Sequence, residues 1–284
     1  YYSLDGSDPI DALTAYNGPI TPTHSSLISS RVLTTGGNWS ALRKATFIAG
    51  IPAGPENLIV SEINYHPDDL HPETEFIELM NISPNEIIDL TNLSFTEGIT
   101  FTFPPNTTLA PGERLLVVED EAAMISGFGP NLNITGEFTN QTNLKNSGEQ
   151  LILTAADGSI IFDFEYSDGP PWPEFADGQG TTLTLIRPQT RPSLSLPGNW
   201  RHSVSEQGSP GTDDSRSFNG ASEDLIDFVL GDFKPQLCHL FDEHLFNFQI
   251  NLGADDFLVI PQFSLDLINW ESLPLPGTPS QLGK

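Results

Sequence analysis

The sequence predicts an all-β protein whose largest part is a sandwich or a barrel. After residue 57, apolar or alternating runs of strand length recur about every ten residues, the spacing typical of many short strands. Glycine and proline, 24 of each, separate these runs and supply turn chemistry. Helical periodicity is limited to two short stretches, so alternating βα units are excluded.

Length and composition agree with a folded protein of several parts. The chain has 284 residues, 37% of them hydrophobic, which allows two domains or one large β domain with appendages. Its formal net charge is −27, from 11 Lys and Arg against 38 Asp and Glu. Scarce bases argue against nucleic-acid binding, because phosphate contacts come mostly from Lys and Arg. No run approaches the roughly 18 apolar residues that a membrane span needs.

Residues 1–50 are predicted to form a small β unit. The opening YYSLDGSDP is a strand that enters an Asp-Gly turn, and Pro9 prevents its continuation. NGPIT is a second turn, and SRVLTT and ATFIAG are further strand-like runs. Residues 51–57, IPAGPEN, contain two prolines and one glycine without periodicity, which is typical of a linker.

Residues 58–212 are predicted to be one sandwich. The strand-like runs are LIVSEINYH, TEFIELMNI, LSFTEGITFTF, RLLVVED, GEQLILTAADGSIIFDFEYS and TTLTLIRP. Residues 119–126, EDEAAMIS, favour a short helix with acids at its start and Gly127 at its end. A domain of ~150 residues buries enough surface to fold alone. The expected core residues are Leu58, Ile59, Ile63, Phe76, Ile77, Leu115, Val117, Leu151, Leu153, Phe162 and Leu183.

The tail differs in pattern. Residues 213–221 are polar and rich in turn formers, which indicates a linker before a module at 222–284. A helix near 222–230 is expected to place Leu225, Phe228 and Val229 on one apolar face. HLFNFQINL and DFLVIPQFSLDLINWESL read as strands, and the Pro- and Gly-rich end is expected to fray.

Residues 1–50 resemble the chitobiase/β-hexosaminidase C-terminal domain family. The resemblance lies in the YYSLDGSDP turn, the YNGPI step, then SRVLTT and NWS before the last strand. It implies a small immunoglobulin-like module that accompanies other domains without catalysing a reaction. The opening strand of that family would precede Tyr1, so the resemblance implies a unit truncated at its start.

Residues 58–212 resemble a lamin-tail domain of the secreted bacterial kind. Seven motifs occur in order: LIVSEINYHPDD, EFIELMN, IDLTNLSF, LAPGERLLVVED, LKNSGEQLILTAADGSIIFDFEY, PPWPEFADGQGTTLTLIRP and NWRHSVSEQGSPG. The resemblance implies an immunoglobulin-like β-sandwich and carries no catalytic residues. Residues 222–270 resemble a C-terminal module of large secreted bacterial proteins, without the D-x-[DN]-x-[DN]-G spacing of a calcium loop.

A metal site is a hypothesis for the loop HPDDLHPETE. Its histidines, His66 and His71, suit zinc together with carboxylates. Calcium would instead take oxygen ligands from the four acidic residues of this loop. The domain has 22 acids and five bases, so cations would also reduce its self-repulsion. The alternative is a solvated loop between two strands. The calcium ligands would be Asp68, Asp69, Glu73 and Glu75.

A second candidate is the loop DGPPWPEFADGQG, where an aromatic ring lies among acids. Trp172 could stack on a sugar while Asp168, Glu174 and Asp177 bind its hydroxyls or an ion. The alternative is that Trp172 plugs the end of the sandwich.

Other titratable residues have plainer readings. Glu62, Glu75 and Glu78 alternate with apolar residues, which predicts solvated strand faces. His239 and His244 are five residues apart, so they would share a face of neither a single strand nor a helix.

The leading functional hypothesis is a non-catalytic assembly of β modules. It would be the adhesive, spacer or binding part of a larger secreted bacterial protein, outside the cell or on its surface. Its expected partners are other domains of a longer precursor and an extracellular protein or glycan surface. No sequence signature of catalysis is present, so no catalytic residue and no cofactor is assigned, calcium apart. The rival hypotheses are a carbohydrate-binding accessory of a glycan-degrading enzyme, or a fragment of an enzyme whose catalytic domain lies elsewhere.

Overall fold

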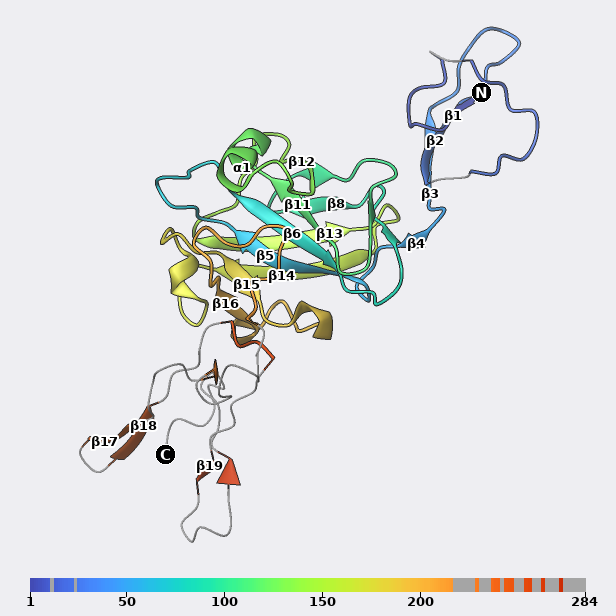
Figure 1. The fold of residues 1–284 in the computed structure, drawn as a ribbon. Helices are drawn as coiled ribbons and strands as arrows, with labels where there is room; N and C mark the ends of the chain where they lie inside the picture. Colours follow the sequence, from blue (N-terminus) through green and yellow to red (C-terminus); the bar gives the residue numbers. More distant parts are fainter. Residues whose placement is uncertain are drawn as a thin grey trace.

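A computed structural model describes most of the chain. The described residues are 1–10, 13–22, 25–216, 228–229, 236–240, 243–247, 253–256, 262–263 and 271–272. The protein is mostly β, and a sandwich of two sheets occupies its centre (Figure 1). The all-β, immunoglobulin-like prediction is thus confirmed.

The first sheet of the sandwich has six strands in the order β12-β11-β6-β5-β15-β16. Only β11 and β12 run parallel to each other, and the other neighbours in this sheet are antiparallel. The strands are, in chain order, β5 (Leu58–Asn64), β6 (Phe76–Asn81), β11 (Arg114–Val118), β12 (Ile134–Glu137), β15 (Leu183–Leu185) and β16 (Trp200–His202).

The second sheet has four strands in the order β14-β13-β8-β9. They are β8 (Ser94–Glu97), β9 (Phe101–Thr102), β13 (Gly148–Thr154) and β14 (Ile160–Ser167). The predicted Asp-Gly hairpin joins β13 to β14, which pair antiparallel along their length. Three short 3₁₀ turns lie beside β15 and β16: η1 (Glu174–Ala176), η2 (Pro188–Thr190) and η3 (Pro197–Asn199).

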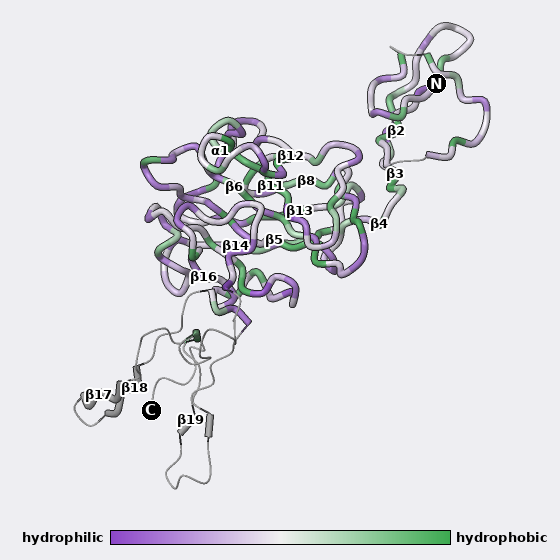
Figure 2. The backbone as a smooth tube through the Cα atoms, in the orientation of Figure 1, coloured by the Kyte–Doolittle hydropathy of each residue, from purple (hydrophilic) through white to green (hydrophobic). Residues whose placement is uncertain are grey.

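Apolar side chains from both sheets form one core between them. All eleven predicted core residues are buried, and ten belong to this core. Each large apolar side chain that is fully buried contributes about 1.5–3 kcal/mol. In Figure 2, hydrophobic stretches follow the central strands and α1 (Glu121–Phe128), whereas many surrounding loops are hydrophilic.

A second, smaller apolar cluster lies outside the six-stranded sheet, under α1. Met124 of the helix packs there with Phe76, Leu116 and Val118. The helix begins after Asp120, whose carboxylate accepts a hydrogen bond from the Ala123 amide at 2.7 Å. It continues past Gly127, the predicted stop, to residue 128. The prediction of that end was wrong because Phe128 packs against the cluster and extends the helix.

The N-terminal unit is a three-stranded antiparallel sheet of β1 (Tyr2–Ser3), β2 (Ser26–Ser30) and β3 (Arg43–Phe47). Within the predicted linker, β4 (Ile51–Pro52) pairs with β7 (Ile88–Asp89), which also pairs with β10 (Thr108–Leu109). Side chains add two more links: the Ser25 hydroxyl donates to the carboxylate of Asp89, and the Asn92 amide donates to Thr46 Oγ1 at 2.9 Å. The connection to the sandwich is therefore hydrogen-bonded.

Near the C-terminus, β17 (Gln236–Leu240) pairs with β18 (Glu243–Asn247), and β19 (Gln262–Phe263) pairs with β20 (Glu271–Ser272). His239 lies opposite His244 in the first pair, a register between two strands that the spacing argument for a single element did not consider. Of the predicted helix near 222–230, residues 228–229 are helical and buried, and the rest lies outside the described residues.

Candidate functional site

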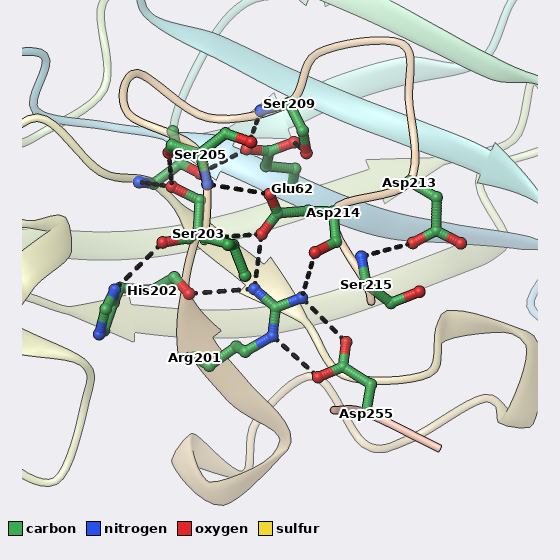
Figure 3. Close-up of polar contacts among 12 residues, drawn as sticks. Glu62, Arg201, His202, Ser203, Ser205, Ser209, Asp213, Asp214, Ser215 and Asp255 are labelled. Carbon is green, nitrogen blue, oxygen red and sulfur yellow. Dashed lines mark hydrogen bonds and ion pairs between the residues drawn. The ribbon is translucent and has the colours of Figure 1, made fainter. Parts of the chain in front are cut away.

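The strongest concentration of buried polar groups lies on the outer face of the six-stranded sheet. Four cross-strand neighbours form a row there: Glu78 of β6, Glu62 of β5, Thr184 of β15 and Arg201 of β16. A β-bulge between Val60 and Glu62 lets Ser61 and Glu62 both serve this face. We call these four residues the polar row. The segment 203–215 covers it (Figure 3).

Glu62 holds the middle of the covering segment. Its carboxylate accepts hydrogen bonds from the Thr182 hydroxyl and from both the amide and the hydroxyl of Ser209, the last two at 2.9 Å. The chain can approach this closely because residue 208 is glycine at φ +88°. A Cβ there would lie 2.6 Å from Cγ2 of Thr182.

Glu78 holds the next part of the same segment. It accepts from the Ser61 hydroxyl and from the Gly211 amide, each at 2.6 Å, and Nε of Arg114 lies 3.0 Å from its Oε1. Burial raises the pKa of Glu78 to about 8, and the charge of Glu62 adds to the shift. Burial likewise raises the pKa of Glu62 to about 7. Two buried carboxyls on opposed residues disfavour double ionisation.

Arg201 forms the far end of the row. Its Nε and Nη2 each donate to the Asp255 carboxylate at 2.9 Å, and its Nη1 donates to Asp214 at 2.6 Å. Asp214 also accepts from the amides of Val204 and Ser205. Burial alone would lower the pKa of Arg201, but the hydrogen bonds and charges of Asp255 and Asp214 raise it. The bidentate pair with Asp255 ties residue 255 to the sheet, and the bond to Asp214 ties the covering segment to it (Figure 3).

A cavity of about 240 Å³ remains beside the polar row. Thr184 Oγ1 and Arg114 Nε are buried and make no hydrogen bond there, the latter despite its distance to Glu78. Carboxyls with raised pKa beside a cavity are also what acid–base catalysis uses. Here all four oxygens of Glu62 and Glu78 already have partners within the protein. These hydrogen bonds therefore hold the segment 203–215 against the outer face of the sheet.

The expectation that Glu62, Glu75 and Glu78 are solvated was wrong. Their exposed fractions are 1%, 6% and 1%. Glu75, just before β6, accepts from the Leu144 amide at 2.6 Å. Burial raises its pKa to about 8, with help from the charges of Glu119 and Glu149. Alternation along a strand predicted the face correctly but could not show that other segments cover it.

The structure does not bring the four proposed calcium ligands together. Asp68 accepts from His71 Nδ1 at 2.7 Å and from the Leu70 amide, Asp69 and Glu73 are exposed, and Glu75 is turned inward. Across the described residues, no three His, Cys, Asp or Glu side chains are placed to hold a metal ion.

The four residues of the Trp172 loop are also separated. Trp172 is 9% exposed and belongs to the core, with its ring 6.1 Å from that of Trp200. Asp168 is half-buried, Glu174 is exposed in η1, and Asp177 lies 2.5 Å from His66 Nδ1. The position of Trp172 agrees with the reading that it plugs the sandwich. The contact between His66 and Asp177 joins the loop HPDDLHPETE to the Trp172 loop, which the sequence had suggested as two separate sites.

Sequence reasoning missed Thr184, Arg201, Asp214 and Asp255 as members of one site. The only available signal was weak: bases are scarce in this chain, and one of them, Arg201, precedes the acids of TDDS by some twelve residues. The pairing between residues 201 and 255 joins distant parts of the chain, which no local pattern reveals.

Comparison with known proteins gives one family. Curated proteins and solved structures yield no match. In the part of the chain that the structure describes, no helix has the length and apolar character needed to cross a bilayer. The lamin-tail resemblance is confirmed over a shorter range than 58–212, and β15, β16 and the covering segment lie beyond it. Residues 52–168 match the Lamin Tail Domain, a non-catalytic module with an immunoglobulin-like fold.

Proposed function

We propose that the chain is a non-catalytic assembly of β modules, the binding or spacer part of a larger secreted bacterial protein, outside the cell or on its surface. The match of residues 52–168 to the lamin tail domain carries this proposal, because that module binds or spaces rather than catalyses. The net charge of −27 favours solubility outside the cell. The resemblance of residues 1–50 to the chitobiase/β-hexosaminidase C-terminal domain adds a second accompanying module.

The connection between the N-terminal unit and the sandwich supports a spacer role. Strand β4 joins the β7–β10 pair, and the contacts of Ser25 with Asp89 and of Thr46 with Asn92 fasten both sides of the junction. A junction with strand pairing and side-chain hydrogen bonds resists bending more than a Gly- and Pro-rich linker does. The proposed partners are other domains of the precursor and an extracellular protein or glycan surface.

An antibody against the 284-residue chain tests the proposal in the bacterium that carries the gene. Intact cells or the culture medium should be labelled, and a blot should show a band well above 31.0 kDa. Labelling only after permeabilisation would overturn the extracellular location. A band at 31.0 kDa in fresh extracts would overturn the larger precursor.

Carbohydrate binding is the second candidate function. Trp172 does not favour it, because its ring is buried against Trp200. The observation that favours it is the cavity beside the polar row, with buried hydrogen-bonding atoms that lack partners.

A further inference from the structure

We infer that the cavity beside the polar row binds a neutral, hydroxyl-rich molecule of the size of one sugar ring. The inference deepens the carbohydrate-binding candidate and rests on a binding role for the chain. The cavity measures about 240 Å³, below the roughly 300–1,000 Å³ of pockets for drug-sized ligands. A single ring is therefore the scale of ligand that fits.

Two buried atoms that make no hydrogen bond within the protein point to a ligand. Thr184 is 8% exposed, lines the cavity, and its hydroxyl makes no hydrogen bond. Arg114 is 12% exposed in its side chain, and its buried Nε also lacks a well-aligned acceptor, although Glu78 Oε1 lies at 3.0 Å. Leaving such groups unpaired in a folded protein is unfavourable, because burial removes the hydrogen bonds that they would make with water. A bound molecule that supplies the missing partners recovers this energy.

The charges around the cavity restrict the class of ligand. Three arginines and six acids line it: Arg114, Arg187, Arg201, Glu62, Glu78, Asp213, Asp214, Asp255 and Asp256. The excess of acids disfavours an anion. A cation alone also fails, because Arg114 Nε is a donor and a cationic group offers no acceptor.

A hydroxyl group meets both demands because it donates and accepts. One hydroxyl can accept from Arg114 Nε while it donates to an acidic side chain. Asp213, whose side chain is 58% exposed, lies 4.0 Å from Arg114 Nη2 and is the nearest such acid with spare capacity. Thr184 Oγ1 can serve either way. Leu185 and Pro188 supply a small apolar wall for the carbon atoms of a ring.

Titration of the folded chain with glucose, galactose, mannose and N-acetylglucosamine, followed by amide NMR shifts, tests the inference. At least one sugar should bind saturably in the millimolar range and shift the amides of Thr184, Ser209 and Thr212. Thr184→Val should weaken binding roughly tenfold, since it removes the hydroxyl and keeps the shape. Thr184→Ser should retain binding.

Two further variants secure the result. Thr108→Val, an exposed threonine on β10, is the matched control and should bind as the unmodified chain does. Arg114→Lys keeps the charge near Glu78 but removes Nε, and it should also weaken binding. It replaces Thr184→Val as the test if that variant fails to fold. No shift with any of the four sugars would overturn the inference and leave a cavity that holds water only. Shifts confined to other amides would overturn it too. Neither result bears on the surface labelling, which tests the proposed function separately.

Discussion

The outer face of the six-stranded sheet is closed in two different ways. Over β6 and β11, α1 covers an apolar patch in which Met124 packs on Phe76, Leu116 and Val118. On the same face, from β6 to β16, the segment 203–215 covers the polar row through carboxylates and a buried arginine. The apolar cover depends on shape and area. The polar cover depends on the ionisation of each group and on every partner being present, so it should be the more sensitive to single changes.

Removal of Arg201 should produce the largest effect. Arg201→Ala leaves Asp214 and Asp255 buried without their cation, and loss of one partner of a buried ion pair costs about 3–5 kcal/mol. Urea unfolding measures the change in the free energy of unfolding. Arg187→Ala, an exposed arginine at the same cavity, is the control and should stay within ~0.5 kcal/mol. A loss below about 1 kcal/mol for Arg201→Ala would show that the pairing of Arg201 with Asp214 and Asp255 does not stabilise the fold.

Truncation of Met124 breaks the apolar cover instead. Met124→Ala should cost about 2–3 kcal/mol, because the sheet and helix collapse only partly into the space left behind. Ile125→Ala is the control from the same helix, since Ile125 is 38% exposed. We expect urea unfolding to separate the two variants clearly. Equal values would mean that α1 does not seal the sheet.

Stability should fall as pH rises from about 5 to about 8. Glu62, Glu75 and Glu78 have folded pKa values of about 7, 8 and 8, above the ordinary value of 4.5. The folded state therefore holds protons that the unfolded state releases, and this contribution is complete below pH 4.5 and lost through pH 7–8. Each such proton contributes a slope of up to about 1.4 kcal/mol per pH unit.

Unfolding free energies measured at several pH values give this slope directly. Glu78→Gln should flatten it, because glutamine at residue 78 does not titrate. Met124→Ala should shift the whole curve without changing its slope, which would distinguish the polar cover from the apolar one. A stability that rises across this pH range would refute the raised pKa values of these buried glutamates.

The helix cap should have the smallest effect. Asp120→Ala removes the acceptor for the Ala123 amide and should cost about 1 kcal/mol. Asp120→Asn keeps an acceptor and should lose less than half of that. Thermal melts of the two variants are sufficient, and an unchanged melting temperature for Asp120→Ala would show that packing alone holds α1.

Strand existence, fold class and core were predictable from local patterns. Alternation identified Ile63, Ile77 and Leu115 as core, and the Asp-Gly pair located the β13–β14 hairpin, because both signals depend on neighbours in sequence. The end of α1 was missed because Phe128 is held by a tertiary contact. Trp172 was left between two roles, since burial of one ring depends on Trp200, 28 positions along the chain.

Local sequence patterns were enough to locate the strands, the apolar face of each strand and the turns, because these follow from the period of two and from Gly, Pro and Asp chemistry. What covers the opposite face of the sheet depends on long-range packing instead. Glu62 and Glu78 would be solvated on an open sheet, but segment 203–215 reaches them from far along the chain. Asp255 likewise reaches Arg201, the last residue of the polar row. Burial then changes their chemistry, because a carboxyl that ionises readily in water keeps its proton to a higher pH in a closed site.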